Sequence, residues 1–141
     1  MSCQLLIHVC SPLRATYNRS MARHLADAER YEAQVFEAGH LALTPHLTLT
    51  RHLDDTDPRQ RARGIELALR YLDRADEVWV FGPRFSEGMK GELMYASCTG
   101  KPIVWYPSGA VCPDGIRLDQ GLLALAFREG GDAILAVGAA R

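Results

Sequence analysis

The residues best suited to chemistry in this chain lie together in the segment 86–92, which reads Ser-Glu-Gly-Met-Lys-Gly-Glu. The segment follows an apolar run at 77–82, typical of a buried strand, and it begins a helical pattern. In open parallel sheets, ligands bind beyond the carboxyl ends of the strands, where the next helix offers free backbone N–H groups and the positive end of its dipole. Glu92 is expected one turn into that helix, where the dipole favours an ionised carboxylate, so we predict that it acts as an anionic nucleophile or base.

The alternative for Glu92 is a solvated helix carboxylate, the usual state of glutamate. Its apolar neighbours favour the site, because Met89, Leu93 and Ala96 mark a buried face beside it. Ser86 has two compatible roles. Its hydroxyl can cap the helix, and together with the backbone N–H groups near Gly88 and Met89 it can hold a phosphate or a sugar hydroxyl.

Strand and helix patterns alternate along most of the chain and are expected to position this turn. Strands are predicted at 5–10, 41–44, 77–81 and 102–106. Helices are predicted from Asn18 as N-cap to a stop at Gly39, from Pro58 to Arg74, and at 87–99 before a stop at Gly100, with 48–57 as a polar connection. Beyond residue 107 the weaker pattern indicates a helix at 118–128 and a final strand at 133–137.

This alternation predicts the fold class. Strand–helix–strand units of this length are right-handed and form a parallel sheet with helices on both faces. A chain of 141 residues is long enough for one full core. We therefore expect a single domain over residues 1–141, an α/β doubly wound, mostly parallel sheet of the flavodoxin or Rossmann type.

The predicted topology brings further residues to the site. In flavodoxin-type strand order, the loops after the first and third strands meet at the topological switch, so Ser11, Arg14 and Arg84 are expected beside Glu92. Arg14 can pair bidentately with a phosphate, the alternative being a surface arginine.

Tyr17 and His46 are weaker candidates for the same site. His46 lies just past the second strand, where it can reach the cleft, although a histidine in a loop is more often solvated or structural. Tyr17 can contact a ligand or simply belong to the start of a helix.

Composition excludes several classes of partner. Sixteen Lys and Arg against seventeen Asp and Glu give a formal net charge of -1, which favours neither a nucleic acid polymer nor an acidic membrane. The apolar run at 5–10 is too short for a signal peptide or a membrane span, so a cytoplasmic protein is expected. The four cysteines have no metal-ligand spacing and are expected to be reduced, and no cofactor motif is present. A cluster of carboxylates at Asp54, Asp55 and Asp57 could form a magnesium site. A solvated acidic loop, in which Asp57 caps the helix that starts at Pro58, is the favoured interpretation. No bound metal is therefore predicted.

Four segments together resemble the nucleoside 2-deoxyribosyltransferase superfamily, which includes the 2′-deoxynucleoside 5′-phosphate N-hydrolases. They are Ser-Pro-Leu-Arg at 11–14, Thr-Pro-His-Leu at 44–47, Ala-Asp-Glu-Val-Trp-Val-Phe at 75–81, and Ser86-x-Gly88-x-x-x-Glu92-Leu93-x-x-Ala96. The chain looks closest to a poorly characterised bacterial and phage branch, and the resemblance is strongest over 5–106.

The resemblance implies cleavage or transfer of an N-glycosidic bond by a double displacement, with Glu92 as the nucleophile at C1′ of a nucleoside or nucleoside 5′-monophosphate. Ser86 stands where the hydrolase branch has a serine that binds the 5′-phosphate. Arg14 is implied at the same 5′ end, and His46 or Tyr17 at the base or sugar. A homo-oligomer in which a neighbouring chain completes the site is also implied.

The sequence departs from the superfamily at one functional position. Active members carry an acidic residue eight positions before the Asp that matches Asp76, where it assists the leaving base, and here that position is Ala68. Glu66 is expected to face another side of the helix. Two alternatives therefore stay open: a nucleotide-binding or sensing module without turnover, and a phosphoribohydrolase like those acting on cytokinin nucleotides, whose Pro-Gly-Gly-x-Gly-Thr motif is absent.

Overall fold

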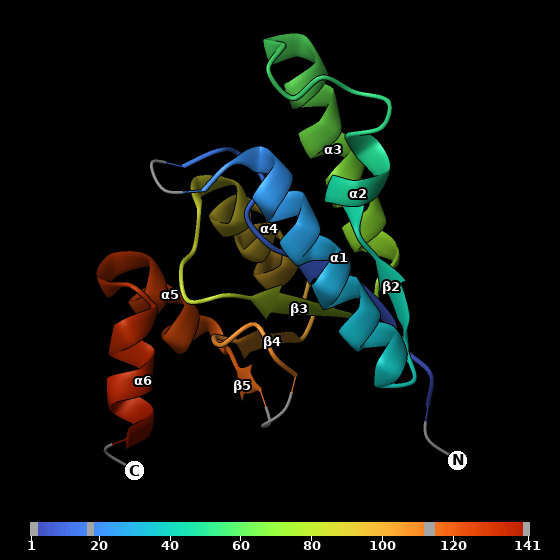
Figure 1. Ribbon diagram of the computed structural model, residues 1–141. Coiled ribbons are helices and arrows are strands. Elements are labelled where there is room, and N and C mark those ends of the chain that lie inside the picture. Colours follow the sequence, from blue (N-terminus) through green and yellow to red (C-terminus); the bar gives the residue numbers. More distant parts are fainter. Residues whose placement is uncertain (1–2, 17–18, 112–114, 140–141) are drawn as a thin grey trace.

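A five-stranded sheet with the order β2-β1-β3-β4-β5 forms the centre of the protein (Figure 1). The computed structural model describes residues 3–16, 19–111 and 115–139. The strands are β1 (Leu6–Cys10), β2 (Leu41–Leu43), β3 (Glu77–Phe81), β4 (Ile103–Tyr106) and β5 (Ile116–Arg117). The first four are parallel, and β5 pairs antiparallel with β4. This order confirms the predicted fold class and places the topological switch between β1 and β3.

In the described part of the chain, six helices connect and cover the strands. They are α1 (Met21–Glu37), α2 (Pro45–Leu49), α3 (Pro58–Arg74), α4 (Glu87–Cys98), α5 (Gln120–Glu129) and α6 (Gly131–Ala139). Figure 1 shows α2 and α3 at the β2 end of the sheet, and α5 and α6 at the opposite end.

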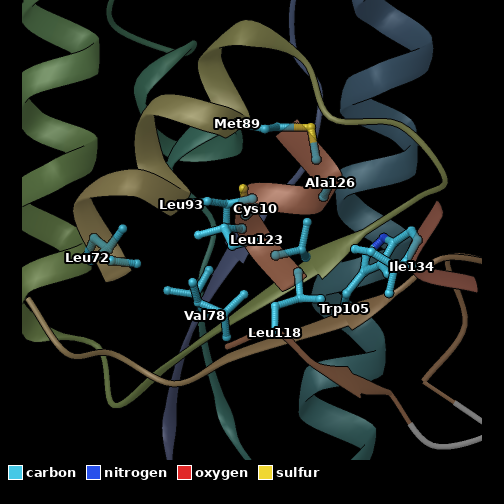
Figure 2. Packing of buried hydrophobic residues seen from close by; sticks show 13 residues of the cluster. Cys10, Leu72, Val78, Met89, Leu93, Trp105, Leu118, Leu123, Ala126 and Ile134 are labelled. Atoms are coloured by element: carbon cyan, nitrogen blue, oxygen red, sulfur yellow. The ribbon is translucent and has the colours of Figure 1, made fainter. Parts of the chain in front are cut away.

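The two faces of the sheet carry separate apolar cores because successive strand residues point to opposite sides. One core joins Ile7, Val9, Trp79 and Phe81 to α1, where the ring of Tyr31 stacks on Phe81 at 4.5 Å. The other joins strand residues such as Cys10, Val78 and Trp105 to side chains from α3, α4, α5 and α6 (Figure 2). The sheet is therefore wound on both faces.

Local signals explain the helix ends. Asp57 caps α3, as predicted, and its carboxylate accepts a hydrogen bond of 2.9 Å from the N–H of Arg59. Gly39 and Gly100 have φ of +89° and +75°, the left-handed conformation that ends α1 and α4. The cap of α1 is Ser20, whereas the predicted cap, Asn18, lies outside the described residues.

Three predictions of secondary structure were wrong or incomplete. The short helix α2 occupies Pro45–Leu49 and so includes the first residues of the predicted polar connection at 48–57. The strand expected at 133–137 is instead part of α6, because a short apolar run fits a strand or a buried helix equally well. The two-residue strand β5 was missed, and it takes the edge of β4 on which a further strand would have paired.

The length and apolar character of the helices decide whether one of them could span a membrane. Among residues 3–16, 19–111 and 115–139, no helix combines the length and apolar character needed to cross a bilayer.

Candidate functional site

A cavity of about 590 Å³ opens at the carboxyl end of β1, at the predicted switch point. Its walls come from the loop 11–16, from α2 and the connection to α3, from one side of α3, and from the first turns of α4. The structure brings seven of the predicted site residues to this cavity: Ser11, Arg14, His46, Ser86, Gly88, Met89 and Glu92.

Two further residues were expected at this site. Tyr17 lies outside the described residues, so its place is not assigned. Arg84 lines a different cavity, toward α5 and α6, so the expectation that it converges on Glu92 was wrong. The chain turns sharply between β3 and α4, with Gly82 at a φ of +99°, and only the residues from Ser86 onward reach the first cavity.

Two side chains of β1, those of His8 and Cys10, lie against the carboxyl group of Glu92. Its Oε2 lies 3.3 Å from Nε2 of His8, and the thiol of Cys10 is hydrogen-bonded to the same carboxyl group. The side chain of Glu92 is 12% exposed, while that of His8 is fully buried. His8 and Cys10 are two residues apart on a strand, so both point to the face that α4 covers.

The surroundings of Glu92 favour its ionised form. Burial alone would raise the pKa of Glu92, but hydrogen bonding and charge from His8, with smaller contributions from His46 and Cys10, hold the pKa below its ordinary value. A carboxylate that stays ionised although it is largely shielded from water is suited to nucleophilic attack.

Cys10 has the opposite character. Burial, followed by the neighbouring Glu92 carboxylate, raises the pKa of the Cys10 thiol well above its ordinary value. The thiol therefore remains protonated and donates to the carboxylate. Of these two residues, Glu92 is the nucleophile candidate.

The first turn of α4 presents backbone donors beside Glu92. Ser86 is the N-cap, its Oγ accepting from the N–H of Met89 at 3.3 Å, and its own N–H donates to the Met89 sulfur at 3.4 Å. The N–H groups of Glu87 and Gly88 belong to the first helical turn, whose N–H groups have no acceptor within the helix. A Cβ at Gly88 would meet no heavy atom within 4 Å, so the space above this turn is open.

Polar groups also gather where β1 and β2 end. Nε2 of His46 donates to the carbonyl oxygen of Ser11 at 2.7 Å. The hydroxyl groups of Ser11 and Thr44 are buried and, within the described part of the chain, have no hydrogen-bond partner. Buried polar atoms are normally paired, so the unpaired Ser11 hydroxyl in the cavity wall is consistent with a polar ligand or water.

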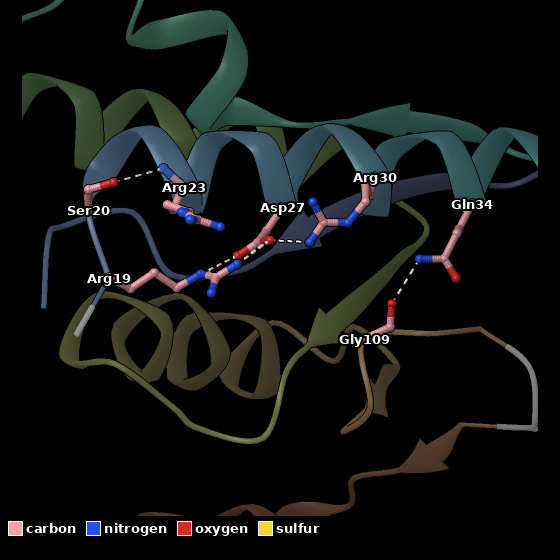
Figure 3. Close-up of polar contacts among 7 residues, drawn as sticks. All are labelled: Arg19, Ser20, Arg23, Asp27, Arg30, Gln34 and Gly109. Carbon is pink, nitrogen blue, oxygen red and sulfur yellow. Dashed lines mark hydrogen bonds and ion pairs between the residues drawn. The ribbon is translucent and has the colours of Figure 1, made fainter.

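A carboxylate on α1 anchors the loop that forms this wall (Figure 3). Arg19, at the end of the loop, donates to both oxygens of Asp27 at 2.7 Å, and Arg30 binds the same group. Burial opposes ionisation of Asp27, but the hydrogen bonds from Arg19 and Arg30 hold its pKa below the ordinary value. The clamp joins the loop to α1 beside the cavity.

The wall formed by α2, α3 and the connection between them is largely apolar, with the side chains of Leu49, Leu53, Ile65 and Leu69. Asp55 and Arg61, joined by a 2.8 Å ion pair, lie among them. Ala68 is part of this wall, whereas Glu66 is exposed on α3 and does not line the cavity, as expected.

His8 and Cys10 are absent from the site that the sequence predicts. The run at 5–10 predicts only a short apolar strand. The available signal was a histidine inside a strand expected to be buried, two residues before a cysteine, since a buried imidazole needs a partner.

The comparisons with known proteins agree with this architecture. A family model described as a domain of unknown function, DUF7768, matches residues 5–106. The chain belongs to this family. No curated protein matches it. Among solved structures, it is similar to a 2-deoxyribosyltransferase from the psychrotolerant bacterium Bacillus psychrosaccharolyticus, with a TM-score of 0.57 and 18% sequence identity over 75% of each chain. This likeness shows that the DUF7768 domain shares the deoxyribosyltransferase fold.

Proposed function

We propose that this protein cleaves or transfers the N-glycosidic bond of a nucleoside or nucleoside 5′-monophosphate, with Glu92 as the nucleophile. The observation that carries the proposal is the carboxylate of Glu92 at the wall of a ligand-sized cavity, kept ionised by His8. The solved structure with the same fold is that of a 2-deoxyribosyltransferase, and its substrate class is extended here to this chain.

The proposed reaction has two displacements. An oxygen of Glu92 attacks C1′ while the bond from C1′ to the base nitrogen breaks, and the base leaves with the bonding electrons and takes a proton from solvent. Water, or a second base, then attacks C1′ of the glycosyl ester, loses a proton, and releases the Glu92 carboxylate. Two such steps retain the configuration at C1′.

The cavity walls suggest the direction in which a substrate binds. Ser86 and the backbone N–H groups of the first turn of α4, with Arg14, form the polar end and would hold the phosphate or the 5′-hydroxyl group. The base would lie toward the apolar wall near Leu53 and Leu69, and His46 lines the same cavity.

The proposal also includes a homo-oligomer in which a neighbouring copy completes the cavity. Size-exclusion chromatography with light scattering tests this part, and a monomer that is fully active would contradict it.

The decisive experiment compares wild type with Glu92→Gln, which keeps the shape of the side chain but removes its charge. Purified protein is incubated with ribo and deoxy nucleosides and their 5′-monophosphates, with and without an acceptor base, and free base is followed by chromatography. Base release by wild type that is lost in Glu92→Gln supports the proposal. Glu66→Gln is the matched control, because Glu66 is exposed on α3 and does not line the cavity, and it should retain activity.

A second candidate function is nucleotide binding without turnover. Ala68 favours it, because no carboxylate stands at that point of the cavity wall to assist a leaving base. Under this alternative, nucleotides raise the melting temperature of wild type while no substrate in the panel releases base.

A further inference from the structure

A second cavity, of about 550 Å³, lies between the segment that follows β3 and the junction of α5 with α6. None of the residues that line it also lines the cavity at Glu92. A ligand bound there would therefore occupy a site separate from that of the proposed substrate.

The charges on this second cavity are unbalanced. Arg84, Lys90 and Arg128 line it, against one carboxylate, that of Asp132. Lys90 has Glu87 as a partner at 3.3 Å on the exposed side of α4. Within residues 3–16, 19–111 and 115–139, no ion pair joins Arg84 or Arg128 to a carboxylate. Unneutralised cations in one concave site create a positive potential that attracts an anion of more than one charge.

The backbone adds further donors. Gly130, with a φ of +85°, ends α5, and α6 starts at the next residue, so first-turn N–H groups of α6 lie in the cavity wall. A Cβ on Gly131 would lie 2.8 Å from the ring of Trp105, so glycine allows this turn to pack directly against the core. The site is thus built on the fixed indole of Trp105, whose Nε1 donates to the carbonyl oxygen of Gly82 at 2.7 Å.

Two aromatic side chains complete the wall. Phe85 and Phe127 line the cavity, and Phe85 packs on Trp105 with ring centroids 5.3 Å apart. Aromatic walls combined with a few charged groups are typical of sites for ring-bearing anionic ligands.

We propose that this second cavity binds an oligophosphate group, with Arg84, Lys90 and Arg128 on the phosphates. The two phenylalanines favour a nucleoside polyphosphate as the source over inorganic polyphosphate. Binding here does not depend on Glu92 or on the proposed reaction, so the two proposals can fail separately.

Isothermal titration calorimetry on the full chain tests the site, with ATP and inorganic tripolyphosphate as probes at one fixed salt concentration. The variant Arg84→Ala/Arg128→Ala should weaken binding by at least about tenfold, since each arginine–phosphate contact is a charge-assisted hydrogen bond. The control Arg51→Ala/Arg63→Ala removes the same charge from two exposed positions outside both cavities and should bind as wild type.

The outcomes separate the possibilities. Equal weakening in both double variants would mean attraction by net charge and would overturn the site, as would wild-type binding by Arg84→Ala/Arg128→Ala. Tripolyphosphate binding as tightly as ATP would support the site but assign it to inorganic polyphosphate. Loss of ATP binding in Arg14→Ala, with Arg84→Ala/Arg128→Ala unaffected, would place the nucleotide in the first cavity instead.

Discussion

Replacing His8 with phenylalanine tests whether this buried imidazole keeps Glu92 ionised. Phenylalanine fills a similar volume but offers no donor to the Oε2 atom that lies 3.3 Å from Nε2 in the wild type. A hydrogen bond to a charged group contributes about 1.5–3 kcal/mol. Without that contribution to the ionised form, the pKa of Glu92 should rise in His8→Phe relative to wild type.

The pH dependence of stability should become weaker in the same variant. In the wild type the lowered pKa of Glu92 adds stability above the ordinary carboxyl pKa, and this stability is lost as the pH falls through the folded-state value. In His8→Phe this stabilisation should be smaller, because burial still opposes ionisation of Glu92 while the hydrogen bond that offsets burial is gone.

The assay is carbon NMR of protein labelled at the glutamate carboxyl groups, with Glu92→Gln used to assign the Glu92 resonance. His8→Gln is the matched control, since its amide keeps an N–H donor and should restore much of the effect. An unchanged Glu92 pKa in His8→Phe would refute the role given to His8. If base release is detected, its acidic limb should move to higher pH in His8→Phe by the same amount.

Three further predictions concern stability and reactivity. Asp27→Asn should lower the free energy of unfolding at pH 7 by about 1.5–3 kcal/mol, because the group that Arg19 and Arg30 contact is no longer charged. The pKa of Asp27 is lowered in the folded state, so the difference from wild type should shrink as the pH falls through the folded-state pKa. Urea titrations at several pH values measure this difference. Iodoacetamide should modify the exposed Cys98 in the native protein and Cys10 only after unfolding, because burial raises the pKa of the Cys10 thiol. Mass spectrometry with and without denaturant tests this, and modification of Cys10 in the native protein would contradict it. Gly131→Ala should cost about 1–3 kcal/mol in urea unfolding because its Cβ would overlap Trp105, whereas Gly88→Ala, with open space around it, should leave stability within about 0.5 kcal/mol of wild type.

The sequence was sufficient for the elements with strong local signals. Helix α3 and strand β3 have the predicted bounds, because Asp57 and Pro58 define the start of the helix and a run of bulky apolar residues defines the strand. Beyond residue 107, only the predicted helix at 118–128 has a counterpart, α5. There the strand β5 has two residues, and the choice between strand and helix at 133–137 depends on which edge of the sheet is already paired.

The candidate site divides in the same way. Ser86 and Glu92 could be proposed from helix geometry alone, since both lie within two turns of a helix start. The contact between His8 and Glu92 joins residues 84 positions apart, and it depends on the register of β1 under α4, which no local pattern contains. The misplaced Arg84 has a related cause, because the direction of a loop side chain follows from the turn at Gly82.

Two separate stretches of the chain form the wall of the first cavity, and they contribute different kinds of side chain. Strand β1, its loop and α4 supply the carboxylate, its imidazole support and the polar end, while the stretch from α2 into α3 supplies the apolar end. Related proteins can therefore acquire new ligand preferences by changing residues between 49 and 69 while the pair of His8 and Glu92 is inherited intact. Within the family, variation in that stretch should follow ligand choice, and His8 should vary only together with Glu92.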